Sequence, residues 1–233
     1  MRILIATFPR DGDIRVGLAK WMAWEVGNCG DWEFNGIEID IEAWEGTHLA
    51  MQRNRAIEYS IRKGYDVIVM VDSDQVPKNG CLLEGLKTIR RYPNPVVTCP
   101  TVTSNGRVLV WQYPGKPVQH DYETYAEYQS TGMIYRGSGG FIMAETKQFR
   151  RLEVPWFCDE FTDDAMIHRS RSQDVWFYDQ CRAADMEILC LWSFWLEHIK
   201  PIPILDKMTS GSTMRSSGPS HPNEPPETAG RHE

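Results

Sequence analysis

Two carboxylates, Asp72 and Asp74, directly follow five apolar residues and are separated by one serine. Alternate residues of an extended chain point the same way, so both carboxylates can reach one hard divalent cation, which can in turn hold a diphosphate. The apolar run, residues 67–71, is typical of a strand buried on both faces, and parallel sheets bind ligands at the carboxyl ends of such strands. The structural alternative is that Asp74 caps the helix expected after Pro77.

Arg53 lies on an otherwise apolar helical stripe, four residues before Ile57 and eight before Ile61. An inward guanidinium needs an anion, and either a buried carboxylate or a ligand phosphate meets that need. The neighbouring Asn54 is suited to orient a ribose or to bind a backbone carbonyl, and we favour the second, structural contact.

Asp174 and His198 have the chemistry of a base and of a metal ligand. Asp174 follows Ser172, a cap-forming residue type, so stabilisation at a helix start is sufficient to explain it. It also suits a general base for a hydroxyl nucleophile beside an acceptor cleft. His198 ends an apolar segment and is either a structural histidine or part of a carboxylate and imidazole site, which suits Mn²⁺.

The elements that would position these residues alternate over the first hundred residues. We expect strands at 2–7, 34–41, 67–72 and 95–99, a helix around 19–22, a second helix from a cap at Thr47 to Lys63, and a third near 80–91. This alternation predicts parallel βαβ units. The second half predicts strands at 108–113, 141–143 and 187–198, a polar connector at 122–135, and a helix from 172 to 184.

Composition sets the class of protein. A chain of 233 residues with a net charge of −7 suits one α/β domain and argues against an extensive surface for nucleic-acid backbones. Six cysteines without metal spacing predict free thiols in a reducing compartment. The N-terminus is typical of a first strand, and no apolar stretch reaches the ~20 residues of a membrane span. We therefore expect a cytoplasmic protein.

Taken in order, five motifs resemble GT-A-fold glycosyltransferases, especially bacterial and phage members related to family 2. The motifs are Asp72-Ser-Asp74 with Pro77, Gly137-Ser-Gly-Gly140 before Phe141, Pro155-Trp-Phe157, Ser172-Gln-Asp174-Val-Trp-Phe177, and His198. The resemblance covers about residues 1–203. It implies a Rossmann-like α/β fold with a mainly parallel central sheet flanked by helices. One domain would span 1–205, with a nucleotide-binding half at 1–105 and an acceptor-binding half at 106–205, before a disordered Ser-, Gly- and Pro-rich tail at 206–233.

The resemblance also implies roles for single residues. On the nucleotide-sugar side they are Thr7, Pro9, Arg53, Asn54, Asp72 and Ser73. The implied metal ligands are Asp72, Asp74 and His198, with Asp74 the direct ligand and Asp72 nearer the ribose and diphosphate. The acceptor side comprises Gly139, Gly140, Trp156 and Gln173, and the implied base is Asp174. Gln173 departs from the family pattern, which has Glu there.

The function implied is transfer of a sugar from a nucleotide-diphosphate sugar, a UDP-hexose by expectation, to a hydroxyl acceptor with Mn²⁺ or Mg²⁺ as cofactor. The default acceptor is a glycan or a lipid-linked sugar, and modified DNA is the lesser alternative. If Asp174 deprotonates the acceptor, the anomeric carbon is inverted. The alternatives are a retaining transferase, a nucleotidyltransferase, and a non-catalytic sugar-nucleotide or glycan-binding protein.

Overall fold

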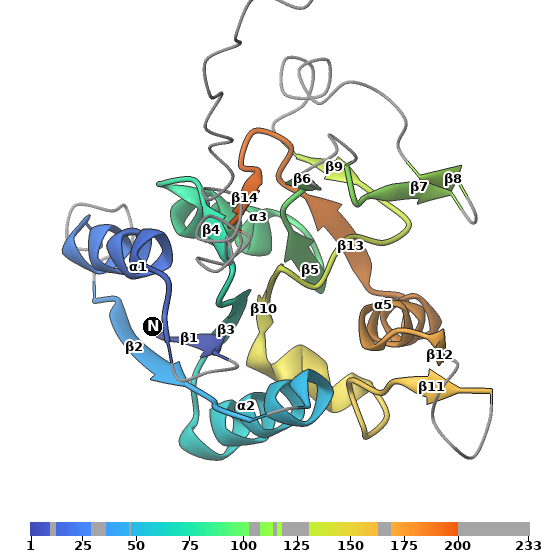
Figure 1. The fold of residues 1–233 in the computed structure, drawn as a ribbon. Helices are drawn as coiled ribbons and strands as arrows, with labels where there is room; N and C mark the ends of the chain where they lie inside the picture. Colours follow the sequence, from blue (N-terminus) through green and yellow to red (C-terminus); the bar gives the residue numbers. More distant parts are fainter. Residues whose placement is uncertain are drawn as a thin grey trace, which may run out of the picture. The chain divides into compact units, whose positions relative to one another are not determined.

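The computed structural model describes residues 1–9, 13–28, 36–46, 48–102, 108–113, 116–117, 131–162 and 169–199. A seven-stranded sheet, in the order β2-β1-β3-β10-β5-β13-β9, forms its centre (Figure 1). The strands are β1 (Arg2–Phe8), β2 (Glu38–Ala43), β3 (Val67–Asp72), β5 (Pro95–Thr98), β9 (Gly132–Met133), β10 (Phe141–Glu145) and β13 (Glu187–Cys190). β10 and β9 run against the other five, so the sheet is mainly parallel as predicted.

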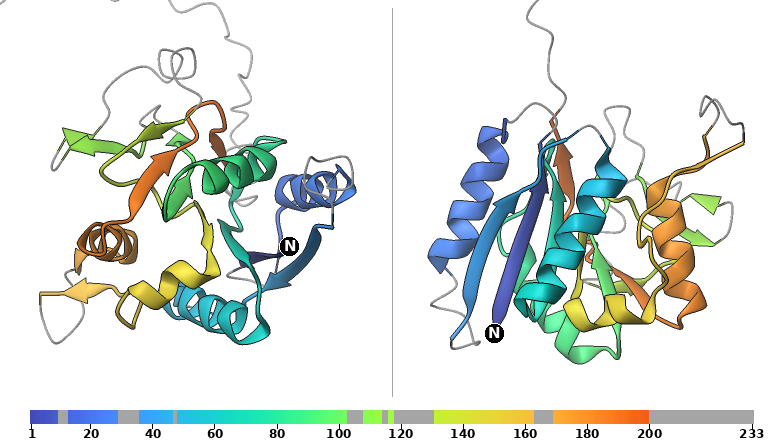
Figure 2. Two further views of the ribbon diagram at one scale, coloured as in Figure 1. Left: turned by 180° about the vertical axis from the view of Figure 1, so that it is seen from behind. Right: turned by 90° about the horizontal axis from the view of Figure 1, so that it is seen from below.

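Helices cover both faces of this sheet (Figure 2). They are α1 (Val16–Asn28), α2 (Leu49–Lys63), α3 (Cys81–Arg91), α5 (Gln173–Ala183) and the 3₁₀ helix η2 (Thr146–Arg151). One apolar core contains residues of α2, η2 and α5, and the other contains residues of α1 and α3. β3 supplies Ile68 and Met70 to the first core and Val67, Val69 and Val71 to the second. The predicted burial of this strand on both faces is confirmed.

The ends of α2 and α5 differ in part from the expected caps. Thr47 lies outside the described residues, and the N-cap of α2 is His48, whose side chain makes no capping bond. Gly64 ends α2 in the left-handed region, with φ of 71°, as glycine's lack of a Cβ permits. Ser172 is the N-cap of α5, but its side chain makes no capping bond either.

The expected single strand at 187–198 is wrong. β13 ends at Cys190, and β14 (Leu196–His198) belongs to a second sheet, where it pairs with β4 (Gln75–Pro77) and β6 (Thr101–Val102). Between them Phe194 N–H donates to the Leu191 carbonyl, which closes a turn. Apolar residues of this stretch are therefore buried although they lie in a turn. Periodicity alone does not distinguish such a turn from a strand.

Two further strand pairs lie in the second half. β7 (Trp111–Tyr113), which covers part of the strand expected at 108–113, pairs antiparallel with β8 (Lys116–Pro117). β11 (Glu160–Phe161) pairs antiparallel with β12 (Arg169–Arg171). Most of the predicted connector and the predicted tail lie outside the described residues. Among the described helices, none combines the length and apolar character needed to cross a membrane.

Candidate functional site

Asp72 and Asp74 face different partners at the carboxyl end of β3. The strand ends at Asp72, and Ser73 and Asp74 form the turn into β4. The chain is therefore not extended across the two carboxylates, and the alternation argument for a shared cation does not apply. The capping alternative for Asp74 is not found either, because Gly80 is the N-cap of α3 and its N–H donates to Glu25 Oε1 at 3.0 Å.

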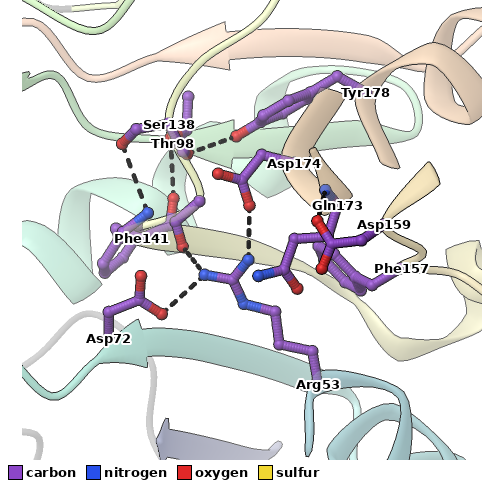
Figure 3. A network of polar contacts seen from close by, with 12 residues as sticks. Arg53, Asp72, Thr98, Ser138, Phe141, Phe157, Asp159, Gln173, Asp174 and Tyr178 are labelled. Atoms are coloured by element: carbon purple, nitrogen blue, oxygen red, sulfur yellow. Dashed lines mark hydrogen bonds and ion pairs between the residues drawn. The ribbon is translucent and has the colours of Figure 1, made fainter. Parts of the chain in front are cut away.

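Arg53 is the centre of the polar network (Figure 3). Its guanidinium donates to Asp72 Oδ1 at 2.7 Å, to Asp174 Oδ1 at 2.6 Å and to the Gly139 carbonyl at 2.6 Å. The Arg53 side chain is 1% exposed, whereas those of Asp72 and Asp174 are 22% and 32% exposed. The anion that the sequence left open is thus a pair of carboxylates, which come from opposite halves of the chain.

Charge and burial oppose each other in this network. Burial alone would lower the pKa of Arg53, but the charges of Asp72 and Asp174 outweigh it and raise that pKa. Burial raises the pKa of Asp72 to about 6; Arg53 opposes this rise and the neighbouring charge of Asp174 adds to it. Because two carboxylates share one guanidinium, the network suits a cation or a proton donor as its further ligand.

Gly139 and Gly140 shape the wall around Arg53. A Cβ on Gly139 would overlap Asp174 Oδ1 and lie 2.6 Å from Arg53 Nη1, so the network needs a glycine there. The Gly140 carbonyl accepts from the Asp72 N–H at 3.1 Å. Of the residues predicted for the acceptor side, Gly139 therefore borders Arg53 and Asp174, and Gly140 binds the backbone of Asp72.

Asp74 and His198 form a second group. β14 pairs with β4 so that His198 lies opposite Gln75, and His198 Nε2 comes within 3.1 Å of Asp74 Oδ2. The His198 side chain is 24% exposed, and the Asp74 side chain is 43% exposed. Within the described ranges no three His, Cys, Asp or Glu side chains converge as a metal-binding group. A carboxylate and an imidazole nevertheless fit two positions of a Mn²⁺ site whose other ligands are phosphate oxygens and water.

Five other predicted site residues have structural partners or lie wholly or partly buried. The Asn54 amide donates to the Phe157 carbonyl at 2.8 Å and accepts from the Phe157 N–H at 2.9 Å, as its structural alternative expected. Trp156 is 9% exposed and donates to the Phe149 carbonyl at 2.8 Å. Thr7 is fully buried, and its hydroxyl finds no partner among the described residues. Pro9 is buried, and Ser73 lies half-buried in the turn. Ligand contacts of these residues stay predictions.

Sequence reasoning missed Asp159, and it named Phe157 only as part of a motif, without a role. Asp159 Oδ1 accepts from the Gln173 N–H at 3.1 Å, at the start of α5 (Figure 3). The Phe157 ring stacks on Phe177 with centroids 4.5 Å apart, and the Arg53 guanidinium lies 5.1 Å from its centroid. Asp159 is one of several acids in an irregular segment, and no spacing in the sequence singles it out.

No protein-family model matches the chain, and no curated protein matches it. Solved structures do. A197 from STIV has a TM-score of 0.60 and 19% identity, covering 86% of this chain and 87% of that one. GalNAc-T7, solved with UDP, GalNAc and Mn²⁺, has a TM-score of 0.57 and 8% identity, covering 86% of this chain. This chain matches only 43% of the GalNAc-T7 chain, less than half its length. At such identities the likeness concerns the fold, and the chain has a GT-A-like α/β fold.

Proposed function

We propose that the protein is a metal-dependent glycosyltransferase, which moves a sugar from a nucleotide-diphosphate sugar, a UDP-hexose, to a hydroxyl acceptor. The observation that carries this proposal is the Arg53 guanidinium, which joins Asp72 of β3 to Asp174 of α5. It brings a donor-side carboxylate and an acceptor-side carboxylate to the strand ends of a GT-A-like sheet, where α/β proteins bind ligands. The GalNAc-T7 structure with UDP, GalNAc and Mn²⁺ supports the same class of ligands.

On the donor side, Asp74 and His198 would hold the divalent cation, with Asp72 beside them. The cation supplies charge neutralisation for the leaving diphosphate. Asp72 keeps one oxygen on Arg53 and has a partly exposed side chain, so it is available to a ribose hydroxyl or to the metal's water. Ser73 lies in the same turn, where its hydroxyl or its backbone would contact the donor.

On the acceptor side, Asp174 would take the proton of the attacking hydroxyl, which gives inversion at the anomeric carbon. Arg53 fixes Oδ1 of Asp174, and the side chain stays 32% exposed. A base that is held from one side and open on the other can receive a proton without first losing its orientation. Gln173 and Gly140, next to the network, would border the acceptor. We expect a glycan or a lipid-linked sugar in this place, with modified DNA as the alternative.

UDP binding tests the donor side. Calorimetric titration of UDP should show that Asp74→Ala and His198→Ala weaken binding in Mn²⁺ and change it little in EDTA, because each removes a side chain that would hold the cation. Glu197→Gln is the matched control, since Glu197 is exposed on the same strand. Equal UDP affinity of wild type and Asp74→Ala in a Mn²⁺ series would contradict the assignment.

The acceptor side needs a separate variant. Asp174→Asn keeps an oxygen for Arg53 but removes the carboxylate that takes the proton, so UDP affinity should persist while UDP release from the donor falls. Loss of a general base costs on the order of 10²–10⁴-fold in rate. Near-wild-type turnover of Asp174→Asn would remove Asp174 as the base and would favour a retaining mechanism.

A further inference from the structure

The start of α5 carries Asp174, yet the helix does not cap itself. The first N–H groups of a helix have no partner within it. The Ser172 side chain makes no capping bond. The Gln173 N–H instead donates to Asp159 Oδ1 at 3.1 Å, from a residue fourteen positions earlier in the chain. A carboxylate in this position also gains from the positive end of the helix dipole.

Asp159 is itself held from several directions. The Asn54 amide of α2 binds the Phe157 backbone on both sides, two residues before Asp159. Phe157 also stacks on Phe177, which belongs to α5. Arg169 Nη1 of β12 lies 3.3 Å from the same Asp159 oxygen that accepts from Gln173. The Asp159 carboxylate therefore binds α5 and β12, and the segment just before it is anchored to α2 and α5.

Gln173, the residue before Asp174, has an uncharged side chain. Gln173 is 8% exposed, and its Oε1 has no hydrogen-bond partner among the described residues. Residue 173 therefore offers no carboxylate of its own, and Asp159 places one at its backbone N–H (Figure 3). The side chain of Asp174 is oriented by Arg53, and its backbone is oriented through the neighbouring N–H that Asp159 holds.

We propose that Asp159 is a positioning residue, which caps α5 from outside the helix and so holds Asp174 in place for the acceptor. This inference rests on the proposed role of Asp174 as the base. It predicts that Asp159 affects turnover with little effect on donor binding, because Arg53, Asp72, Asp74 and His198 keep their contacts without it.

Four variants, one of them a control, test the inference. Asp159→Ala removes the oxygen that accepts the hydrogen bond from the Gln173 N–H, and Asp159→Asn keeps an oxygen there without the charge. Glu153→Gln is a control, which removes the charge of an exposed acid six residues earlier. Arg169→Gln removes the ion pair between Arg169 and Asp159, and it is the variant to measure if Asp159→Ala does not fold. Melting curves establish which variants are folded. The measurements are amide hydrogen exchange at Gln173, the Asp174 carboxyl ¹³C resonance, and kcat and KM for UDP release from the accepted UDP-sugar.

In Asp159→Ala we expect exchange at Gln173 to rise and kcat to fall, each on the order of tenfold, as for loss of a helix cap. The Asp174 resonance should shift, and KM for the donor should not change. Asp159→Asn should return each of these quantities most of the way to its wild-type value. Arg169→Gln should show the same changes as Asp159→Ala at smaller size, and Glu153→Gln should match wild type. Unchanged exchange at Gln173 in Asp159→Ala, or in Arg169→Gln if it alone folds, would overturn the inference.

The two proposals fail differently. If the wild-type protein releases no UDP from any donor, the proposed function fails, while exchange at Gln173 and the Asp174 resonance still decide whether Asp159 holds the helix start. If wild type is active and Asp159→Ala loses donor affinity as much as turnover, the positioning role is wrong and the glycosyltransferase assignment stands.

Discussion

The guanidinium of Arg53 decides the shape of the site at the scale of single residues. A charge that is 1% exposed is costly to bury unless it is paired and hydrogen-bonded. Two carboxylates and one carbonyl meet that need, although Nε of Arg53 finds no partner among the described residues. Removing the guanidinium would leave two carboxylates close together without a counter-charge.

Arg53→Ala should therefore lower the free energy of unfolding by about 3–5 kcal/mol, the usual cost of breaking a buried ion pair. Arg55→Ala, which removes the same side chain from an exposed position of α2, should stay within about 0.5 kcal/mol of wild type. Urea denaturation at neutral pH measures both. Equal stability of the two variants would show that Arg53 is not the counter-charge of the network.

Gly139→Ala tests the same network by volume. The added Cβ would overlap Asp174 Oδ1, so we expect Asp174 to be displaced and UDP release to fall at least tenfold, with a smaller loss of UDP affinity. Gly27→Ala is the control, because a Cβ there meets no atom within 4 Å and alanine is the better helix residue. Wild-type turnover of Gly139→Ala would mean that the contact of Asp174 with Arg53 is dispensable.

The inward position of Arg53 was predictable from the sequence, but its contacts were not. The apolar stripe around Arg53 correctly predicted an inward guanidinium, because helical spacing is local information. Its partner Asp174 lies 121 residues later, and no local pattern connects the two. Asp159 shows the same limit, since it contacts the start of α5 from fourteen residues earlier, in a segment whose Phe157 is held by Asn54 and Phe177.

At the scale of elements, buried strands and glycine-terminated helices were predicted best. β3 and the end of α2 at Gly64 follow from an apolar run and from one left-handed position. The division of residues 187–198 into β13 and β14 was missed, although it is what brings His198 beside Asp74. A turn made of apolar residues has no composition signal that separates it from a strand.

The start of α3 gives a pH-dependent prediction. Glu25 of α1 is buried, and burial raises its pKa to about 7 against the opposing hydrogen bond from the Gly80 N–H. A raised carboxyl pKa stabilises the fold below the unfolded value near 4.5, and this contribution is lost as the pH rises to about 7. The loss attributable to Glu25 is on the order of 3 kcal/mol.

Glu25→Gln keeps an oxygen for Gly80 and cannot ionise, so unfolding free energies at pH 5 and pH 8 should differ less for this variant than for wild type. At pH 8 the variant should be the more stable of the two. Glu58→Gln, at an exposed position of α2, should retain the wild-type pH dependence. The interpretation fails if Glu25→Gln and wild type lose the same stability between pH 5 and pH 8.

At the scale of the whole molecule, the site joins the two halves that the sequence predicts. Arg53 and Asp72 come from the first half, and Gly139 and Asp174 from the second, with β10 inserted between β3 and β5 to bring them together. The order of motifs was enough to indicate a GT-A-like fold. The donor sugar and the acceptor depend on loop geometry, which neither motif order nor sheet topology specifies.

We propose above that this site transfers the sugar of a nucleotide-diphosphate sugar and so releases a nucleoside diphosphate. The most direct test is to incubate the protein with a panel of sugar nucleotides in Mn²⁺ or EDTA and to measure UDP, other nucleoside diphosphates and pyrophosphate. We expect UDP release from a UDP-hexose, dependent on Mn²⁺ and reduced on the order of 10²–10⁴-fold in Asp174→Asn. Release of pyrophosphate, or the absence of any product with every donor, would contradict the proposed function.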